Sequence, residues 1–168
     1  MATVNIAYAA SATLTNAIES LGTSSTFVAG YESAVFDNTT TKYVDVLLAG
    51  TVTVGTTPTA NTAILIYVAA IRDDAPAYHD VLDGTTSAET ITSVGVGAGF
   101  LKLAAVLSVD TNTSDRAYGF GPVSVAQLFG GIMPNKFSLF TAHNTGVNLN
   151  ATGGNHVFKT TGITYTVA

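Results

Sequence analysis

The sequence predicts an all-β protein: an antiparallel, jelly-roll-like β-sandwich of about eight strands with an extended N-terminal arm. Threonine alone supplies 27 of the 168 residues, and with Val, Ile, Tyr and Phe it favours a pleated, half-buried backbone. Short apolar segments recur between turn residues, which is the spacing of a sandwich or barrel. We assign all 4 prolines to turn contexts, and we expect no alternation of strands with helices of the kind found around a parallel sheet.

The chain is predicted to have two parts. Residues 1–20 form an N-terminal arm or edge element, and residues 21–168 form a single β-sandwich domain. Apolar residues between Leu14 and Leu21 can share one face of a helix, but the threonines and asparagine among them are poor helix formers. We therefore expect an extended arm, with a short helix as the alternative.

Each strand is expected where an apolar or β-branched run ends in a turn signal. The expected strands are 27–37, 42–54, 63–72, 89–96, 100–109, 118–125, 136–142 and 157–167. The first ends at Asp37, ahead of a threonine run, and Gly50 predicts a bulge or bend in the second. The third is apolar on both faces, so we expect it inside a layered structure or beneath a partner subunit.

The later strands rest on different signals. The runs 89–96 and 100–109 flank a glycine-rich turn, and 118–125 carries two glycines and a proline. Larger apolar side chains alternate with small or polar ones through much of 136–142, and 157–167 closes the chain as a final β-branched run. These patterns place strands at all five ranges.

Turn-forming residues define the connections between the strands. Loops are expected at 55–61, 73–87, 110–116 and 143–156. The segment from Gly95 to Gly99 is predicted to be a flexible turn, because its glycine spacing differs from that of phosphate-binding loops and we expect no helix after it. One helical turn is expected from Ser124 to Phe129, before a glycine pair.

The charge pattern excludes several classes of function. Lys and Arg total 6 against 11 Asp and Glu, for a net charge of −5, and the basic residues are scattered, so we expect no nucleic-acid partner. The longest strongly apolar run, 63–71, is far shorter than the roughly 20 residues of a membrane helix. Met1 to Ala17 carries no Lys or Arg, so we expect no secretory signal and synthesis in a cytoplasm. The absence of cysteine excludes disulfides and thiolate ligands.

No group of residues meets the requirements of a catalytic, cofactor or metal site, so we expect no enzyme activity, cofactor or small-molecule substrate. Asp73, Asp74, Asp80 and Asp83 lack the spacing of a calcium loop and are interpreted as a solvated loop. His79 stands beside Asp80 without a nucleophile motif. His143 and His156 flank a segment without a carboxylate, so we expect no shared metal there.

A chain this poor in charge and this apolar is expected to be a homo-oligomer, dimeric or trimeric, or part of a larger assembly. Two segments are the candidate contact surfaces. The residues proposed to contact a partner are Val4, Ile6, Tyr8 and Leu14 in the arm, and His143, Asn144, Asn150 and Asn155 in the Asn/Gly-rich loop. For that loop, an internally hydrogen-bonded structure and a recognition role both remain open.

Three groups of segments together resemble a known family. They are Phe27-Val-Ala-Gly-Tyr-Glu-Ser33 with Val35-Phe-Asp-Asn-Thr39; Gly55-Thr-Thr-Pro-Thr-Ala60; and Phe129-Gly-Gly-Ile-Met-Pro134 with Thr141-Ala-His-Asn-Thr-Gly146 and Asn150-Ala-Thr-Gly-Gly-Asn155. Over most of residues 25–168 the chain resembles the head decoration, or capsid cement, proteins of tailed bacteriophages. The resemblance implies a structural virion protein on the capsid exterior that binds the major capsid protein as an oligomer. It implies no catalytic residue.

Two other functions remain as alternatives. One is a tail or fibre module that recognises a host-surface glycan through loop 143–156 and exposed tyrosines. The other is a small hydrolase, which would need a serine or aspartate to converge on His79, His143 or His156.

Overall fold

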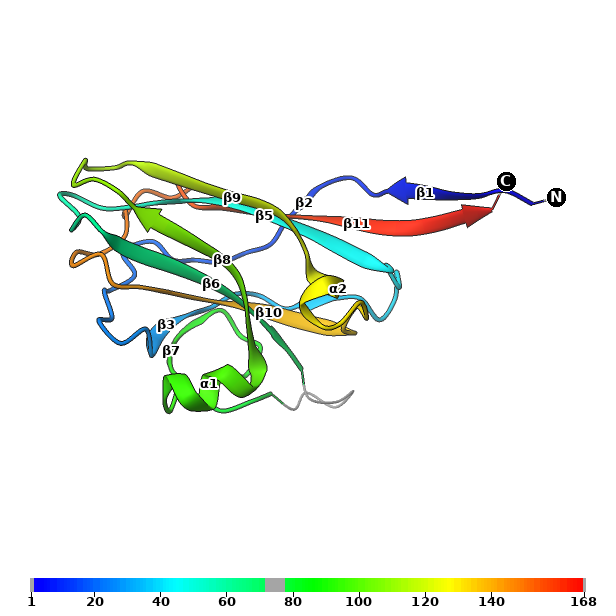
Figure 1. Cartoon of the computed structure of the whole chain (residues 1–168), viewed down its shortest axis with the longest axis horizontal. Coiled ribbons are helices and arrows are strands. Elements are labelled where there is room, and N and C mark those ends of the chain that lie inside the picture. Colours follow the sequence, from blue (N-terminus) through cyan, green and yellow to red (C-terminus); the bar gives the residue numbers. More distant parts are fainter. Residues whose placement is uncertain (1, 72–77, 168) are drawn as a thin grey trace.

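The computed structural model describes residues 2–71 and 78–167, which form two antiparallel β-sheets and two short helices (Figure 1). The predicted all-β sandwich class is confirmed, with 46% of the residues in strands and 7% in helices. Neither helix in the described ranges has the length and apolar character that crossing a membrane requires.

The first sheet brings the two ends of the chain together. Its strands are, in order, β1 (Val4–Tyr8), β11 (Val157–Val167), β5 (Asp45–Thr53) and β9 (Ala117–Ser124), with β2 (Ala12–Thr13) also paired to β11. A register shift between β5 and β9 falls between Leu48 and Gly50, which confirms the irregularity predicted at that glycine. Gly50 has no room for a side chain, because a Cβ would lie 2.8 Å from the Phe120 ring.

The second sheet contains the remaining strands. Their order is β7 (Ser87–Thr90), β3 (Ala29–Glu32), β10 (Lys136–His143), β6 (Thr62–Ala70) and β8 (Leu101–Val109), with β4 (Phe36–Asp37) also paired to β10. The strand expected at 27–37 is therefore divided into β3 and β4. Between them the Ser33 hydroxyl accepts a hydrogen bond from Leu139 N, and Ala34 N donates a hydrogen bond to Thr15 O.

The main core lies between the two sheets. Because side chains alternate across a strand, Val46 and Leu48 of β5 face Ile64 and Ile66 of β6, and all four are fully buried. The segment after β2 contributes Ile18, which is also fully buried although its segment is neither strand nor helix. Neither the predicted arm nor the alternative helix describes this segment, since it packs into the core without regular structure.

A second apolar cluster covers the outer face of the second sheet. Phe140 of β10 and Ala69 of β6 point away from the main core and pack with Leu82, Ile91 and Leu101. This explains why strand 63–72 appeared apolar on both sides: the chain's own residues cover the outer face. The predicted position of this strand inside layered structure is confirmed.

The outer layer contains one clear correction to the sequence prediction. The strand expected at 89–96 is wrong in its second half, because β7 ends at Thr90 and helix α1 spans Val94–Phe100. The flexible turn expected at Gly95–Gly99 is wrong for the same reason. Ser93 caps the helix by accepting a hydrogen bond from Val96 N at 3.1 Å, which satisfies a backbone donor that the helix itself leaves open. The helical turn expected near Ser124 is confirmed as α2 (Val125–Leu128).

Candidate functional site

The two chain ends form a two-stranded ribbon that projects beyond the sandwich (Figure 1). Strand β1 pairs with the last part of β11 from Val4 opposite Val167 to Tyr8 opposite Ile163. The neighbouring strand β5 begins only at Asp45, opposite Ile163. Residues 164–167 therefore have β1 as their sole strand partner within the described chain, and the projection is roughly 13 Å long at the usual rise of a strand.

One face of this ribbon is entirely apolar. Alternation along the two strands places six side chains on it: Val4, Ile6, Tyr8, Ile163, Tyr165 and Val167. We call this set the apolar ribbon face. Five of its members are 60% to 72% exposed, and only Ile163 is half-buried. Contiguous exposed apolar side chains of this kind are typical of an interaction surface.

The base of the ribbon is held by close packing. The ring of Tyr43 lies over Gly162, where any Cβ would overlap the ring atoms. Ala9 N donates to Gly162 O at 2.9 Å, and Val44 N donates to Ile163 O at 2.9 Å. The ribbon is thus fixed where it leaves the sandwich, and its apolar face is presented in one direction.

The predicted contact residues divide into accessible and buried sets. Val4, Ile6 and Tyr8 lie on the apolar ribbon face. Leu14 and His143 are buried among the chain's own residues, so they offer no surface to a partner. Leu14 packs in the main core, and its N–H donates a hydrogen bond to Phe158 O of β11.

The three asparagines of the predicted contact loop are engaged mainly with the chain itself. Asn144 accepts a hydrogen bond from Ala63 N at 2.8 Å through its side-chain oxygen. The side-chain oxygen of Asn150 accepts hydrogen bonds from Thr152 N and from Asn155 Nδ2. The loop is therefore internally hydrogen-bonded, and within it Asn155 has an exposed side chain.

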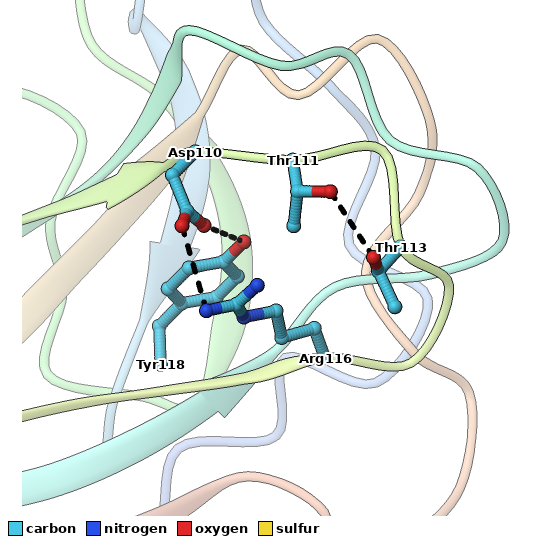
Figure 2. Close-up of polar contacts among 5 residues, drawn as sticks. All are labelled: Asp110, Thr111, Thr113, Arg116 and Tyr118. Atoms are coloured by element: carbon cyan, nitrogen blue, oxygen red, sulfur yellow. Dashed lines mark hydrogen bonds and ion pairs between the residues drawn. The ribbon is translucent and has the colours of Figure 1, made fainter.

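This loop belongs to a polar cluster at the end of the sandwich opposite the ribbon. Asn150 Nδ2 donates to Asp115 Oδ1 at 2.6 Å, which joins it to the β8–β9 connection. In that connection Asp110 accepts a hydrogen bond from the Tyr118 hydroxyl at 3.0 Å and pairs with Arg116 at 3.4 Å (Figure 2). The Arg116 guanidinium also lies 5.6 Å from the centre of the Tyr118 ring. These contacts fix the loop that crosses between the two sheets.

A shallow polar hollow of about 500 Å³ lies beside this cluster. Asp115, Asn148 and Asn150 line it together with Thr56 and Thr152. Its described lining contains no aromatic side chain of the kind on which sugars stack. This hollow is lined by part of the 143–156 loop, to which the alternative glycan-binding function was assigned.

Three carboxylates come together at the edge of the second sheet. Ligand atoms of Glu32, Asp83 and Glu89 all lie within 4.8 Å of one another. Burial raises the pKa of Glu32, although hydrogen bonds from Ser138 Oγ, Asp83 N and Gly84 N act in the opposite direction. The side-chain hydrogen bond from Thr85 lowers the pKa of Asp83. Each carboxylate is thus already engaged by donors of the chain.

The predicted acidic loop is not assembled as a unit in the described residues. Asp83 joins Glu32 and Glu89, whereas Asp80 accepts hydrogen bonds from Thr92. Asp73 and Asp74 lie outside the described residues. The sequence prediction did not find the two glutamates because it assigned Glu89 to the strand after the acidic loop, and because Glu32 lies on a strand distant in sequence.

The histidines occupy separate sites. His143 bonds Leu21 O at 2.9 Å and Thr145 Oγ1 at 3.0 Å, and burial lowers the pKa of its ring. His156 lies near Asn150 O at 2.9 Å, and His79 stacks on Phe100. Both buried rings tie loops to strands, which is a structural role.

A small apolar pocket of about 190 Å³ lies under helix α1. Phe27, Tyr67, Ile91 and Leu103 contribute to its lining. The sequence prediction missed this pocket because it assigned no helix at that position. A space of this volume is below the usual range for a ligand site.

Comparisons with protein-family models, with curated proteins and with solved structures find no match for this chain.

Proposed function

We propose that this protein is a structural virion protein, a decoration or cement protein that binds the outside of a phage capsid and reinforces its subunit seams. Its partners would be the major capsid protein of the same phage and further copies of itself, as a dimer or trimer. The observation that carries the proposal is the apolar ribbon face. It is a fixed, projecting and uncharged surface that no described part of the chain covers.

The strand order supports a jelly-roll topology, which is frequent in capsid proteins. If β1 with β2, and β3 with β4, each count as one strand and β7 is set aside, eight strands remain. The two sheets then have the orders first-eighth-third-sixth and second-seventh-fourth-fifth. These are the orders of a double Greek key, which supports a rigid body able to hold a contact surface in place.

The chemistry of the ribbon suits a seam that must hold under changing salt. Val4, Ile6, Tyr165 and Val167 carry no charge, so contacts through them are not weakened by ionic screening. Each contact is small, but a symmetric shell repeats it many times. Contacts repeated on one oligomer add by avidity, so a modest surface can bind firmly.

The experiment is to add purified protein to capsids that lack it and to count bound copies by cryo-electron microscopy. We expect ordered density at subunit seams or symmetry axes. The variant I6S/Y8S should reduce occupancy by roughly tenfold or more, since it removes two large apolar contacts. The matched control, N5S/T166S, changes the opposite face of the same ribbon and should bind normally.

Two results would contradict this proposal. Equal occupancy for I6S/Y8S and the control would remove the ribbon from the contact. Absence from capsids, with density on the tail or fibre of intact particles, would favour the glycan-recognition module and its polar hollow.

A further inference from the structure

Strand β1 has an open edge whose geometry follows from its pairing with β11. In an antiparallel pair, alternate residues direct their backbone groups toward the partner strand. Ala9 N donates to Gly162 O, in the same register as the rest of the pair. Ala7 and Asn5 therefore face β11, and the N–H and C=O groups of Val4, Ile6 and Tyr8 point outward.

The other sheet edges carry features that discourage pairing with another chain, and β1 carries none. Edge strand β9 contains Pro122 and a register shift, and edge strand β8 contains Lys102 and a register shift. The third, β7, has only four residues and includes Glu89. Charge, proline and irregularity are the usual protections of an edge strand. The unprotected sequence of β1 is Val-Asn-Ile-Ala-Tyr.

We propose that this edge binds a second copy of the chain, β1 against β1, in an antiparallel pair with a twofold axis at Ile6. A twofold interface needs a surface that is complementary to itself. The outward groups of Val4, Ile6 and Tyr8 have that property because they are evenly spaced about Ile6. Because β1 carries no charged side chain, two copies can pair without repulsion between like charges.

The register of this pair is fixed by the outward groups. With Ile6 opposite Ile6 of the partner copy, Val4 stands opposite Tyr8, and every outward N–H meets an outward C=O. This arrangement forms six backbone hydrogen bonds, two for each opposed pair. If one copy slides along the other by two residues in either direction, only two of these hydrogen-bonded pairs remain. The two apolar ribbon faces join into one continuous apolar surface.

This inference does not depend on the capsid, so it is tested on the purified full chain in solution. Sedimentation equilibrium should show a dimer that strengthens with concentration. I6P removes an outward N–H while sparing the bonds to β11, so it should weaken the dimer by roughly tenfold or more. I6A loses most of the same side chain but keeps the N–H, and it should remain dimeric.

A single-cysteine experiment locates the twofold axis, because the chain has no cysteine of its own. Opposed residues in a hydrogen-bonded pair lie about 5.5 Å apart between Cα atoms, within the range of a disulfide. I6C should therefore form a covalent dimer under oxidation. N5C should not, because it stands opposite Ala7 rather than opposite its own copy.

Several results would overturn the inference. These are a wild-type monomer at all concentrations, equal effects of I6P and I6A, or equal crosslinking of I6C and N5C. Equal effects of I6P and I6A would indicate association through the apolar face instead of the edge. Loss of capsid binding in I6S/Y8S with an intact solution dimer would separate the two proposals.

Discussion

At the scale of single residues, buried polar groups connect segments of the chain inside the molecule. Glu32 is fully buried, and its carboxylate connects three segments through Ser138 Oγ at 2.8 Å, Asp83 N at 2.9 Å and Gly84 N at 3.1 Å. A buried charge with hydrogen-bond partners still loses solvation. Burial disfavours the charged form of Glu32 and the hydrogen bonds favour it, so the stability of the fold depends on pH.

We predict that the Glu32 carboxyl makes the wild-type protein lose stability, relative to a variant without it, as pH rises above about 4.5. Burial raises the pKa of Glu32 above its ordinary value of 4.5, so the folded state binds a proton more tightly than the unfolded state does. The free energy of unfolding then falls as pH rises through the folded pKa. E32Q removes this titrating group while His143 still titrates in both proteins, so the stability difference between wild type and E32Q should shrink as pH rises, measured by urea denaturation at several pH values.

The E32Q variant should also be less stable throughout, by roughly 1–3 kcal/mol, because its amide nitrogen cannot accept from Asp83 N. Equal pH slopes for wild type and E32Q would contradict the assignment. Asp37 does not confuse the measurement, since hydrogen bonds from Thr39 lower the pKa of its carboxyl to about 2, below the range studied.

At the scale of elements, helix α1 shows how a glycine-rich sequence can still be helical. Gly97 is buried against the second apolar cluster, and a Cβ there would lie 2.9 Å from Ile91 Cδ1 and 3.2 Å from Leu101 Cδ1. Gly99 faces open space. The helix needs glycine at position 97 for close packing. It has no steric need for glycine at position 99.

The two glycines therefore form a matched pair for mutation. G99A should raise the free energy of unfolding by about 0.5–1 kcal/mol, since alanine is the better helix former. G97A should lower it by roughly 1–3 kcal/mol through overpacking against Ile91. Thermal or chemical denaturation measures both. A destabilising G99A would show that this segment is not helical.

The elements that the sequence predicted well are those with clear periodicity. Strands such as 42–54, 136–142 and 157–167 contain β-branched and apolar residues in sufficient number to mark them. Helix α1 escaped because glycine favours a turn in the absence of tertiary contacts, and its cap at Ser93 is a weak local signal. Tertiary packing determines the structure of this segment, and a local sequence pattern does not reveal tertiary packing.

At the scale of the whole molecule, the sandwich and the ribbon are energetically separate. The ribbon's apolar face is mostly exposed, while Leu14 of the following segment belongs to the main core. A two-stranded ribbon by itself is only marginally stable. The body should therefore fold without β1.

Two deletions test this separation. Removal of residues 2–9 should change the free energy of unfolding by less than about 1 kcal/mol, because it removes mostly exposed side chains. Removal of residues 2–15 also takes β2 and Leu14, and should cost roughly 2–5 kcal/mol. Circular dichroism melts compare the two proteins. Equal losses would show that β1 itself stabilises the body.

Only half of the ribbon was found from the sequence. The predicted contacts Val4, Ile6 and Tyr8 came from the arm, while Ile163, Tyr165 and Val167 were assigned to an ordinary strand. Their alternation with threonine was visible, but two strands about 155 residues apart show no local sign that they pair. The buried Leu14 and His143 were chosen as contacts because neither composition nor spacing reports burial of a single side chain.

The chain ends are neighbours at the tip of the ribbon, as Val4 stands opposite Val167 (Figure 1). A fluorescent protein or affinity tag fused at either terminus would therefore emerge at the same place, beside the apolar ribbon face. Under the proposed function, such fusions should interfere with assembly even though the body folds. The exposed turn around Gly153 and Gly154, where an added side chain meets nothing, lies at the opposite end and is the better position for displaying a foreign peptide.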